Sequence, residues 1–196
     1  MGHAINDEAL NILFRNAHTH NKWQDKPLTP QMLMAIYDLM RWAPTSANGN
    51  PARILFLVSK AAKERVKPFL SNANQEKSMQ APAVALIAHD LDFAEHMPKL
   101  FPHRPQMKDV FKDPKIAEIT AFRNGTLQGA YFILAARALG LDCGPMSGFD
   151  NAGVDKEFFP DGRWKSNFLC NIGYGDEAGV FPRNPRLSFD EACKIL

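Results

Sequence analysis

The feature of this sequence that most constrains its fold is a long helical pattern between Lys115 and Leu139, which ends at Gly140. Apolar residues occur around much of the circumference of this helix, so it should be buried on most sides. Small residues leave room for another element to approach closely, and they are Gly125, Gly129, Ala130, Ala135 and Ala136. In a chain of 196 residues, burial of this kind indicates either the central helix of the core or the seam of a dimer.

The remaining patterns predict a few strands and further helices. Apolar and β-branched runs bounded by turn residues predict buried strands at residues 53–59, 82–89 and 166–175. Helices are predicted at residues 7–15, 30–40, 61–70 and 154–159, with a last helix that begins at the capping box of Ser188 and Glu191. Thr29 is the expected N-cap of the second helix, and Pro30 occupies its first position. Residues 142–150 are rich in glycine and proline and are expected to form a loop.

The length fits a single domain over residues 1–196. Helices and strands mix without a strict βαβ repeat, which is typical of an α+β fold with a central small β-sheet flanked by helices. Residues 90–114 are broken by prolines, rich in Phe, Met and His, and without a clean period. We expect this stretch to form a mobile, lid-like insertion over a pocket.

The composition argues against several classes of partner. The formal net charge is +2 and the basic residues are scattered, so neither nucleic acid nor an anionic membrane is expected as a partner. No run approaches the ~20 apolar residues of a membrane span, and the N-terminus lacks the features of a signal peptide. The three cysteines are widely spaced and form no CxxC pair, so a disulfide framework is not expected. A cytoplasmic protein fits these features best.

Common nucleotide, metal and hydrolase motifs are absent from the sequence. It contains no GxGxxG fingerprint, no GxxxxGK[ST] phosphate loop, no HExxH pair and no GxSxG elbow. His96 and His103 lie in the proline-broken stretch, where regular metal-ligand spacing cannot be assumed. No metal site is therefore expected.

Three polar loops and a late basic pair remain as candidates to carry chemistry. The loops are AHTHN at 17–21, PTSANGNP at 44–51 and GPMSGFD at 144–150, and the basic pair is Arg183 and Arg186. Each loop alone has a structural explanation, because Ser, Thr, Asn, Gly and Pro form caps and turns. Together they supply amide and hydroxyl donors, close backbone approach and two phosphate-pairing guanidinium groups. That combination suits a flavin mononucleotide (FMN).

A set of longer motifs runs along nearly the whole chain. They are THN at 19–21, Trp42 with APTSAN at 43–48, PAR at 51–53, ITAFRN at 119–124, ARALGLDCGPMSGFD at 136–150, NIGYGD at 171–176 and PRLSFDEAC at 185–193. With these motifs the sequence resembles the nitroreductase superfamily, and within it the branch that contains malonic semialdehyde reductases. The GLDCGPMSGFD and PTSAN matches are the specific ones.

The resemblance implies an intertwined homodimer with one FMN at each end of the subunit interface, contacted by both chains. Thr19 and Asn21 would lie near the phosphate and the ring edge of FMN, and Asn74 and Lys77 near its ribityl chain and pyrimidine edge. The other implied contacts are Ser46, Asn48 and Asn50 in a flavin loop contributed across the interface, Pro145, Met146, Ser147 and Gly148 along one flavin face, and Arg183 and Arg186 at the phosphate.

One implied cofactor contact departs from the family pattern. Relatives usually have Arg where this chain has His18, so a fixed charge near the phosphate is lost. Arg15, one turn away, could compensate. Because His titrates near neutrality and Arg does not, a weaker or more pH-sensitive FMN affinity would follow.

The resemblance also implies an activity, in which hydride passes from NADH or NADPH to the flavin and then to a small substrate in a ping-pong cycle. No obligatory protein acid or base is implied, and Lys77 is the candidate for stabilising charge on the reduced flavin. The implied reaction reduces malonic semialdehyde to 3-hydroxypropionate. Substrate contacts are expected from the lid-like stretch, at Phe101, His103, Arg104 and Phe111, with core packing as the alternative for at least one phenylalanine.

Three alternatives stay open at this point. The chain could be a general nitro or quinone reductase, a flavin-binding protein without useful turnover, or an oligomerising scaffold whose long helix is only an interface. Bleaching of bound flavin by NAD(P)H separates a reductase from a mere binder, and a scaffold would be colourless.

Overall fold

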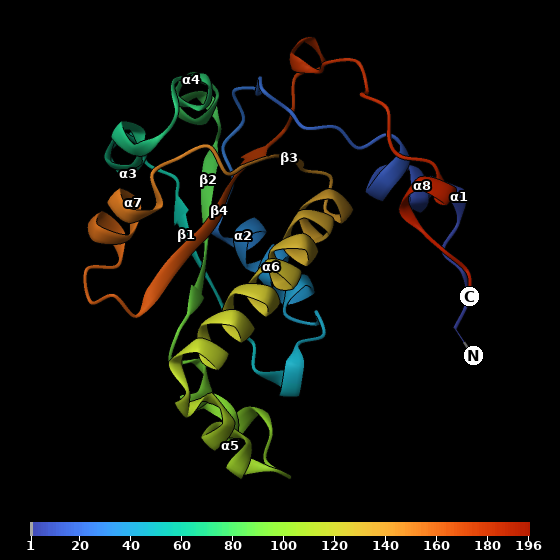
Figure 1. Ribbon diagram of the computed structural model, residues 1–196. Helices are drawn as coiled ribbons and strands as arrows, with labels where there is room; N and C mark the ends of the chain where they lie inside the picture. The colour runs from blue at the N-terminus through green and yellow to red at the C-terminus, as the bar shows by residue number, and fades with distance from the viewer. Residues whose placement is uncertain (1) are drawn as a thin grey trace.

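A four-stranded antiparallel sheet forms the centre of the computed structural model, which describes residues 2–196 (Figure 1). The strands lie in the order β1-β2-β4-β3. Their bounds are Ala52–Leu57 for β1, Ala83–Asp90 for β2, Asp142–Met146 for β3 and Trp164–Gly173 for β4. Strand β2 is buried at all of its positions, so both faces of the sheet are covered.

Five of the eight helices in residues 2–196 cover the two faces of this sheet. The helices are α1 (Asp7–Leu10), α2 (Pro30–Met40), α3 (Lys60–Val66), α4 (Asn72–Gln80), α5 (Met97–Leu100), α6 (Pro114–Ala138), α7 (Asn151–Phe158) and α8 (Phe189–Ala192). Helices α2 and α6 lie on one face, and α3, α4 and α7 lie on the other (Figure 1). This arrangement confirms the α+β fold with a small central sheet.

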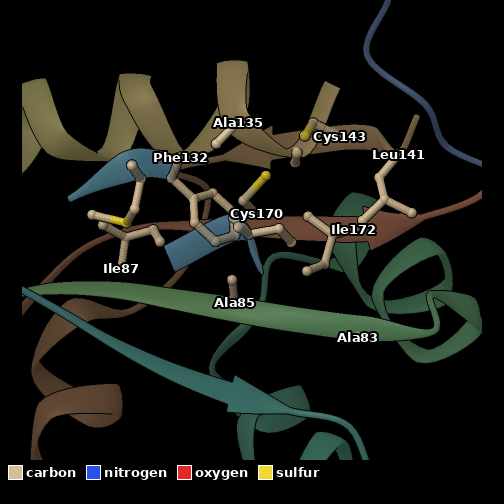
Figure 2. Close-up of a cluster of buried hydrophobic side chains, with 12 residues drawn as sticks. Ala83, Ala85, Ile87, Phe132, Ala135, Leu141, Cys143, Cys170 and Ile172 are labelled. Carbon is tan, nitrogen blue, oxygen red and sulfur yellow. The ribbon is translucent and has the colours of Figure 1, made fainter. Parts of the chain in front are cut away.

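The long helix α6 lies close against the sheet because two glycines permit it. A Cβ atom on Gly125 would lie 3.0 Å from Cβ of His89, and one on Gly129 would lie 2.5 Å from the ring of Phe168. Figure 2 shows the resulting core, in which Phe132 and Ala135 of α6 meet small and branched side chains of β2 and β4.

The opposite face of α6 is exposed in the single chain. Ile119, Phe122 and Leu127 keep 57%, 52% and 47% of their surface accessible. The helix is therefore a core helix on one face only, and its outward face has the apolar character expected of a dimer seam.

Local signals predicted two helices accurately, and tertiary pairing overturned one loop. Helix α2 begins at Pro30, and the Thr29 side chain accepts a hydrogen bond from the backbone N–H of Met32. The capping box of α8 is also present. The prediction that residues 142–150 form only a loop was wrong, because Asp142–Met146 pairs with β4 as an edge strand. Pro145, which has no N–H to donate, is tolerated at a sheet edge.

The expected irregular stretch at 90–114 is helical in short pieces. The 3-10 turns Phe93–His96 and Pro105–Lys112 flank α5. The stretch also has its own apolar cluster, in which the rings of Phe93 and Phe111 lie 4.8 Å apart between centroids. This cluster packs the stretch against the start of α6.

The two ends of the chain lie together and away from the sheet. Helix α1 continues as a π-helix at Asn11–Arg15, and α8 lies beside α1 at a distance from the central sheet (Figure 1). Every residue from 181 to 196 is exposed. Within residues 2–196, no helix combines the length and the apolar character that crossing a membrane requires.

The buried His89 makes stability depend on pH. Its ring lies edge-on to Phe122 near the end of β2, and burial lowers its pKa while the nearby Asp155 and Glu118 partly oppose the shift. Below the ordinary pKa of about 6.5 the unfolded chain takes up a proton that the folded chain resists, so stability falls as the pH drops.

We expect the free energy of unfolding to fall by about 1 kcal/mol more between pH 7.5 and 5.5 in the wild type than in His89→Gln. Urea unfolding at both pH values measures this difference. An equal fall in both proteins would contradict it.

Candidate functional site

Helix α4 is bound to the turn that follows β3. The Nδ2 group of Asn74 donates to the carbonyl oxygen of Gly148 at 2.9 Å, and the backbone N–H of Ser71 donates to the same oxygen at 3.0 Å. The Cβ of an alanine at Gly148 would lie 2.8 Å from that Asn74 nitrogen. The predicted cofactor residues of α4 and of the 145–148 segment are therefore in direct contact.

The segment around Asn21 packs on the same helix. Nζ of Lys77 lies 3.4 Å from Oδ1 of Asn21, and the indole Nε1 of Trp23 donates to the Lys77 carbonyl oxygen at 3.1 Å. Burial lowers the pKa of Lys77, and no acidic partner is recorded for its ammonium group among the ion pairs of residues 2–196. A half-buried, desolvated cation thus stands beside an amide.

Strand β3 contacts residues 19–21 and fixes their position beside the sheet. Thr19 forms a parallel bridge with Cys143, and the backbone N–H of His20 donates to the Cys143 carbonyl oxygen at 3.1 Å. A Cβ atom at Gly144 would lie 2.7 Å from the carbonyl oxygen of His20, so only glycine permits this approach. Cys143 itself is fully buried, in agreement with a packing role.

We call these residues the α4 group. Its members are Thr19, Asn21, Asn74, Lys77, Pro145, Met146, Ser147 and Gly148. Met146 is buried, and its sulfur accepts a hydrogen bond from the Ser78 hydroxyl at 3.6 Å. Ser147 and Gly148 are exposed. The α4 group therefore has buried members, Asn74 and Met146, beside the solvent-exposed Ser147 and Gly148.

The two late arginines are placed differently. Arg183 donates to the carbonyl oxygens of Arg15 and Ala17 at 2.8 and 2.9 Å, which brings its guanidinium next to the Thr19 segment. Arg186 donates to the carbonyl oxygens of Asn184 and Pro185, its immediate neighbours. Arg183 is thus the arginine that the fold brings near the α4 group.

Arg183, rather than Arg15, brings a positive charge beside His18, because its guanidinium is bound to the carbonyl oxygen of the neighbouring Ala17 at 2.9 Å. The Arg15 guanidinium is bound to Asp7 at 2.6 Å, so the idea that it compensates for His18 finds no support. His18 lies in a pocket of about 1030 Å³ that also contains the carboxylates of Asp142, Asp176 and Glu177. A phosphate inside this pocket would meet negative charge, so a phosphate near His18 requires the Arg183 guanidinium as its positive partner.

The second predicted set lies in residues 45–51, which we call the 45–51 loop. Ala47, Asn48 and Asn50 have φ values of 50°, 52° and 44°, a left-handed conformation that is uncommon outside glycine. Nδ2 of Asn48 donates to the Leu100 carbonyl oxygen at 2.8 Å. The loop is therefore in contact with the end of α5.

The predicted substrate residues follow directly after this contact. Phe101 is half-buried and its ring lies 4.1 Å from that of His103 between centroids, while Arg104 is exposed. Phe111 is buried in the cluster with Phe93, which gives it the core-packing role held as its alternative. Substrate contact by the other three side chains stays a prediction.

The two sets lie at opposite ends of the sheet. In the β1–β2 register Ala52 pairs with His89 and Leu57 pairs with Val84. The 45–51 loop leads into Ala52, whereas α4 leads into Ala83 at the other end of β2. Eight strand residues span roughly 25 Å, so a single chain does not bring the two sets together.

The sequence patterns did not identify several polar side chains that support these sets. Asn124 and Gln128 of α6 and Arg53 of β1 hydrogen-bond to the 45–51 loop or its ends. Asn124 and Arg53 belong to the ITAFRN and PAR motifs, but no local pattern assigned them, or Gln128, to the support of this loop. Among residues 2–196, no group of three or more His, Cys, Asp or Glu side chains is arranged to hold a metal ion.

Comparison with known proteins agrees with this arrangement. Residues 15–174 match the nitroreductase family. A Stenotrophomonas maltophilia protein is 56% identical over 196 residues, and one from Rhodopseudomonas palustris is 52% identical over 196 residues, with 100% of both chains covered in each case. Both relatives carry the provisional name NADH dehydrogenase/NAD(P)H nitroreductase. The chain therefore belongs to the nitroreductase family.

A solved structure shares the fold at much lower identity. The provisionally assigned nitroreductase from Exiguobacterium sibiricum, solved in complex with FMN, superposes with a TM-score of 0.87 at 17% identity, covering 100% of this chain and 99% of the other. This likeness confirms the nitroreductase-type fold.

The close approach at Gly144 gives a test of the α4 group. Gly144→Ala should lower the free energy of unfolding by about 1–3 kcal/mol, because the new methyl group meets the His20 carbonyl oxygen in a packed region. Urea unfolding measures the loss. Gly2→Ala, whose Cβ meets nothing within 4 Å, is the control. Equal stability of Gly144→Ala and wild type would show that the segment is not held in this way.

Proposed function

We propose that this chain is an FMN-dependent oxidoreductase that takes hydride from NADH or NADPH and reduces a small substrate. The observation that carries this proposal is the α4 group. It brings together the amide groups of Asn21 and Asn74, the desolvated ammonium group of Lys77 and the exposed backbone of Ser147 and Gly148. Membership of the nitroreductase family supports it, as do relatives named NAD(P)H nitroreductase and a fold neighbour solved with FMN.

The donors of the α4 group fit a flavin. Asn74 and Asn21 offer amide groups, and Lys77 offers a cation, as the pyrimidine edge and ribityl chain of FMN require. The phosphate would be held by Thr19 and Arg183, with Arg186 as a further candidate. His18 would lie close to it.

The protein residues bind, orient and stabilise, while the flavin supplies hydride chemistry when bound. Lys77 is already desolvated, and a cation in such a place stabilises negative charge on the pyrimidine edge more strongly than it would in water. The Asn74–Gly148 hydrogen bond fixes the backbone of the 145–148 segment, which would line one face of the flavin. None of these roles requires a side chain to act as acid or base.

The proposal includes an intertwined homodimer in which the 45–51 loop of one chain completes the α4 group of the other. The outward apolar face of α6 supports such an interface. The C-terminal segment supports intertwining, because Leu187, Phe189 and Ile195 keep 70%, 60% and 87% of their surface exposed. Apolar side chains on an extended arm are stabilised when they pack on a partner.

Malonic semialdehyde, reduced to 3-hydroxypropionate, is the substrate we propose. An arginine or lysine side chain binds the carboxylate of this substrate best. Arg104 is exposed and follows the Phe101–His103 pair. The same segment is bonded to the 45–51 loop through the Leu100 carbonyl oxygen. Nitro compounds, which the nitroreductase names of the relatives favour, and quinone compounds are the second candidates.

The visible absorption spectrum before and after anaerobic NADH or NADPH tests the oxidoreductase proposal. Protein supplied with FMN should show flavin bands that bleach rapidly, and free FMN with the same nicotinamide is the control. Bands that persist would indicate a flavin-binding protein without turnover. Protein that stays colourless would remove the proposal.

Arg104→Ala tests the carboxylate contact. It should raise KM for malonic semialdehyde about tenfold, as expected for the loss of one charge-assisted hydrogen bond, and leave KM for a nitroaromatic unchanged. Lys112→Ala, at the end of the same segment and paired with Asp109, is the matched control. An equal rise for both substrates would refute the assignment.

A further inference from the structure

Two buried amide side chains on α6 contact the 45–51 loop and have no role in the function proposed above. Asn124 and Gln128 are 4% and 3% exposed and lie one turn apart on the same helix face. A buried amide is destabilising unless its donors and acceptors are bonded. The partners of these two amides lie largely in the loop.

Gln128 contacts the loop end with both of its polar atoms. Its Oε1 accepts from the backbone N–H of Ala52 at 2.8 Å, and its Nε2 donates to Oδ1 of Asn50 at 3.1 Å. The Asn50 carbonyl oxygen also accepts from Nη1 of Arg53 at 3.0 Å. Asn50 is therefore held at its side chain and at its backbone.

Asn124 contacts the start of the same loop. Its Oδ1 accepts from the backbone N–H of Ser46 at 2.8 Å, while its Nδ2 donates to the Thr120 carbonyl oxygen at 2.8 Å. The bond to Thr120 fixes which amide atom faces the loop. The two amides thus bind the loop at both of its ends.

The loop depends on such support. Ala47, Asn48 and Asn50 all have positive φ values although none is glycine. This conformation costs free energy that the surrounding contacts must offset. Without the α6 amides the loop would relax, and ordering it again would weaken any binding that uses it.

We propose that Asn124 and Gln128 are positioning residues that preorganise the 45–51 loop for flavin binding. They act through Ser46 and Asn50, and the inference rests on the proposed function for the ligand only. The order of the loop in FMN-free protein is independent of that function.

Hydrogen exchange of the FMN-free protein is the first test. Gln128→Met removes both hydrogen bonds at similar side-chain volume, so amides in residues 44–52 should exchange about tenfold faster, equivalent to ~1.4 kcal/mol of lost protection. Amides of β2 away from the loop should be unchanged. Lys156→Met, which places the same side chain at an exposed position of α7 on the other face of the sheet, should leave residues 44–52 as in wild type.

FMN affinity is the second test. Gln128→Met should bind FMN about tenfold more weakly, and Lys156→Met should bind it as wild type does. Unchanged exchange and unchanged affinity in Gln128→Met would overturn the inference. If Gln128→Met exchanges faster but the wild type binds no FMN, the proposed function is refuted and the support of the loop by α6 stands.

Gln128→Glu should give a pH dependence of FMN affinity that a simple loss of packing would not produce. This variant also tests the inference if Gln128→Met does not fold. A protonated carboxyl can accept from Ala52 and donate to Asn50, but a carboxylate cannot donate. The ratio of the variant Kd to the wild-type Kd should therefore rise several-fold from pH 5 to pH 8. A flat ratio would contradict the inference.

The charged and titratable groups near this position are the same in both proteins. Arg53 binds the Asn50 carbonyl oxygen and is paired with Asp90, and His89 lies opposite Ala52 in the β1–β2 register. The other charged side chains that line the same cavity as Gln128 are Asp38, Arg41 and Lys99, and the titratable His96 also lines it. Because titration of these groups changes the Kd of both proteins, the ratio of the two Kd values reports the ionisation of residue 128.

Discussion

The antiparallel pairing of β1 with β2 decides where each part of the candidate site lies. The 45–51 loop enters β1 at one end of the sheet, and α4 enters β2 at the other. The helix that covers both strands, α6, holds the loop with buried amides and presents apolar side chains outward. Its inner face positions a part of the site, and its outer face supports the interface through which a second chain would complete that site. Helix α6 therefore contributes to the core, to the support of the 45–51 loop and to the proposed dimer interface.

The fold was predictable where the signals are local. Helix α2 was predicted at both ends, because Thr29 and Pro30 mark its start and its apolar spacing continues to Met40. Helix α4 was missed, since NANQEKSMQ has no apolar period and its buried positions are the polar Asn74 and Ser78. Strand β3 was taken for a loop, because Gly144 and Pro145 are turn formers and only pairing with β4 makes the segment a strand.

The site was predictable to the extent that the family resemblance names residues. It named Asn21, Asn74 and Lys77, and the structure places all three together. It did not name Gln128, whose bonding partners lie 76 and 78 residues away in the sequence. Such a contact depends on how α6 lies across β1, which no local pattern records. The pairing of Arg15 with Asp7, eight residues earlier, was also not predicted from the sequence.

The central claim is that each flavin site takes the α4 group from one chain and the 45–51 loop from its partner. Mixing two defective variants tests it most directly, with Lys77→Met as the α4 defect and Asn50→Ala as the loop defect. If the two chains are refolded together in equal amounts, half of the dimers are mixed, and each mixed dimer has one site with both parts intact. FMN binding should then recover to about one quarter of the wild-type sites. Recovery no greater than that of the separate variants would contradict the two-chain site.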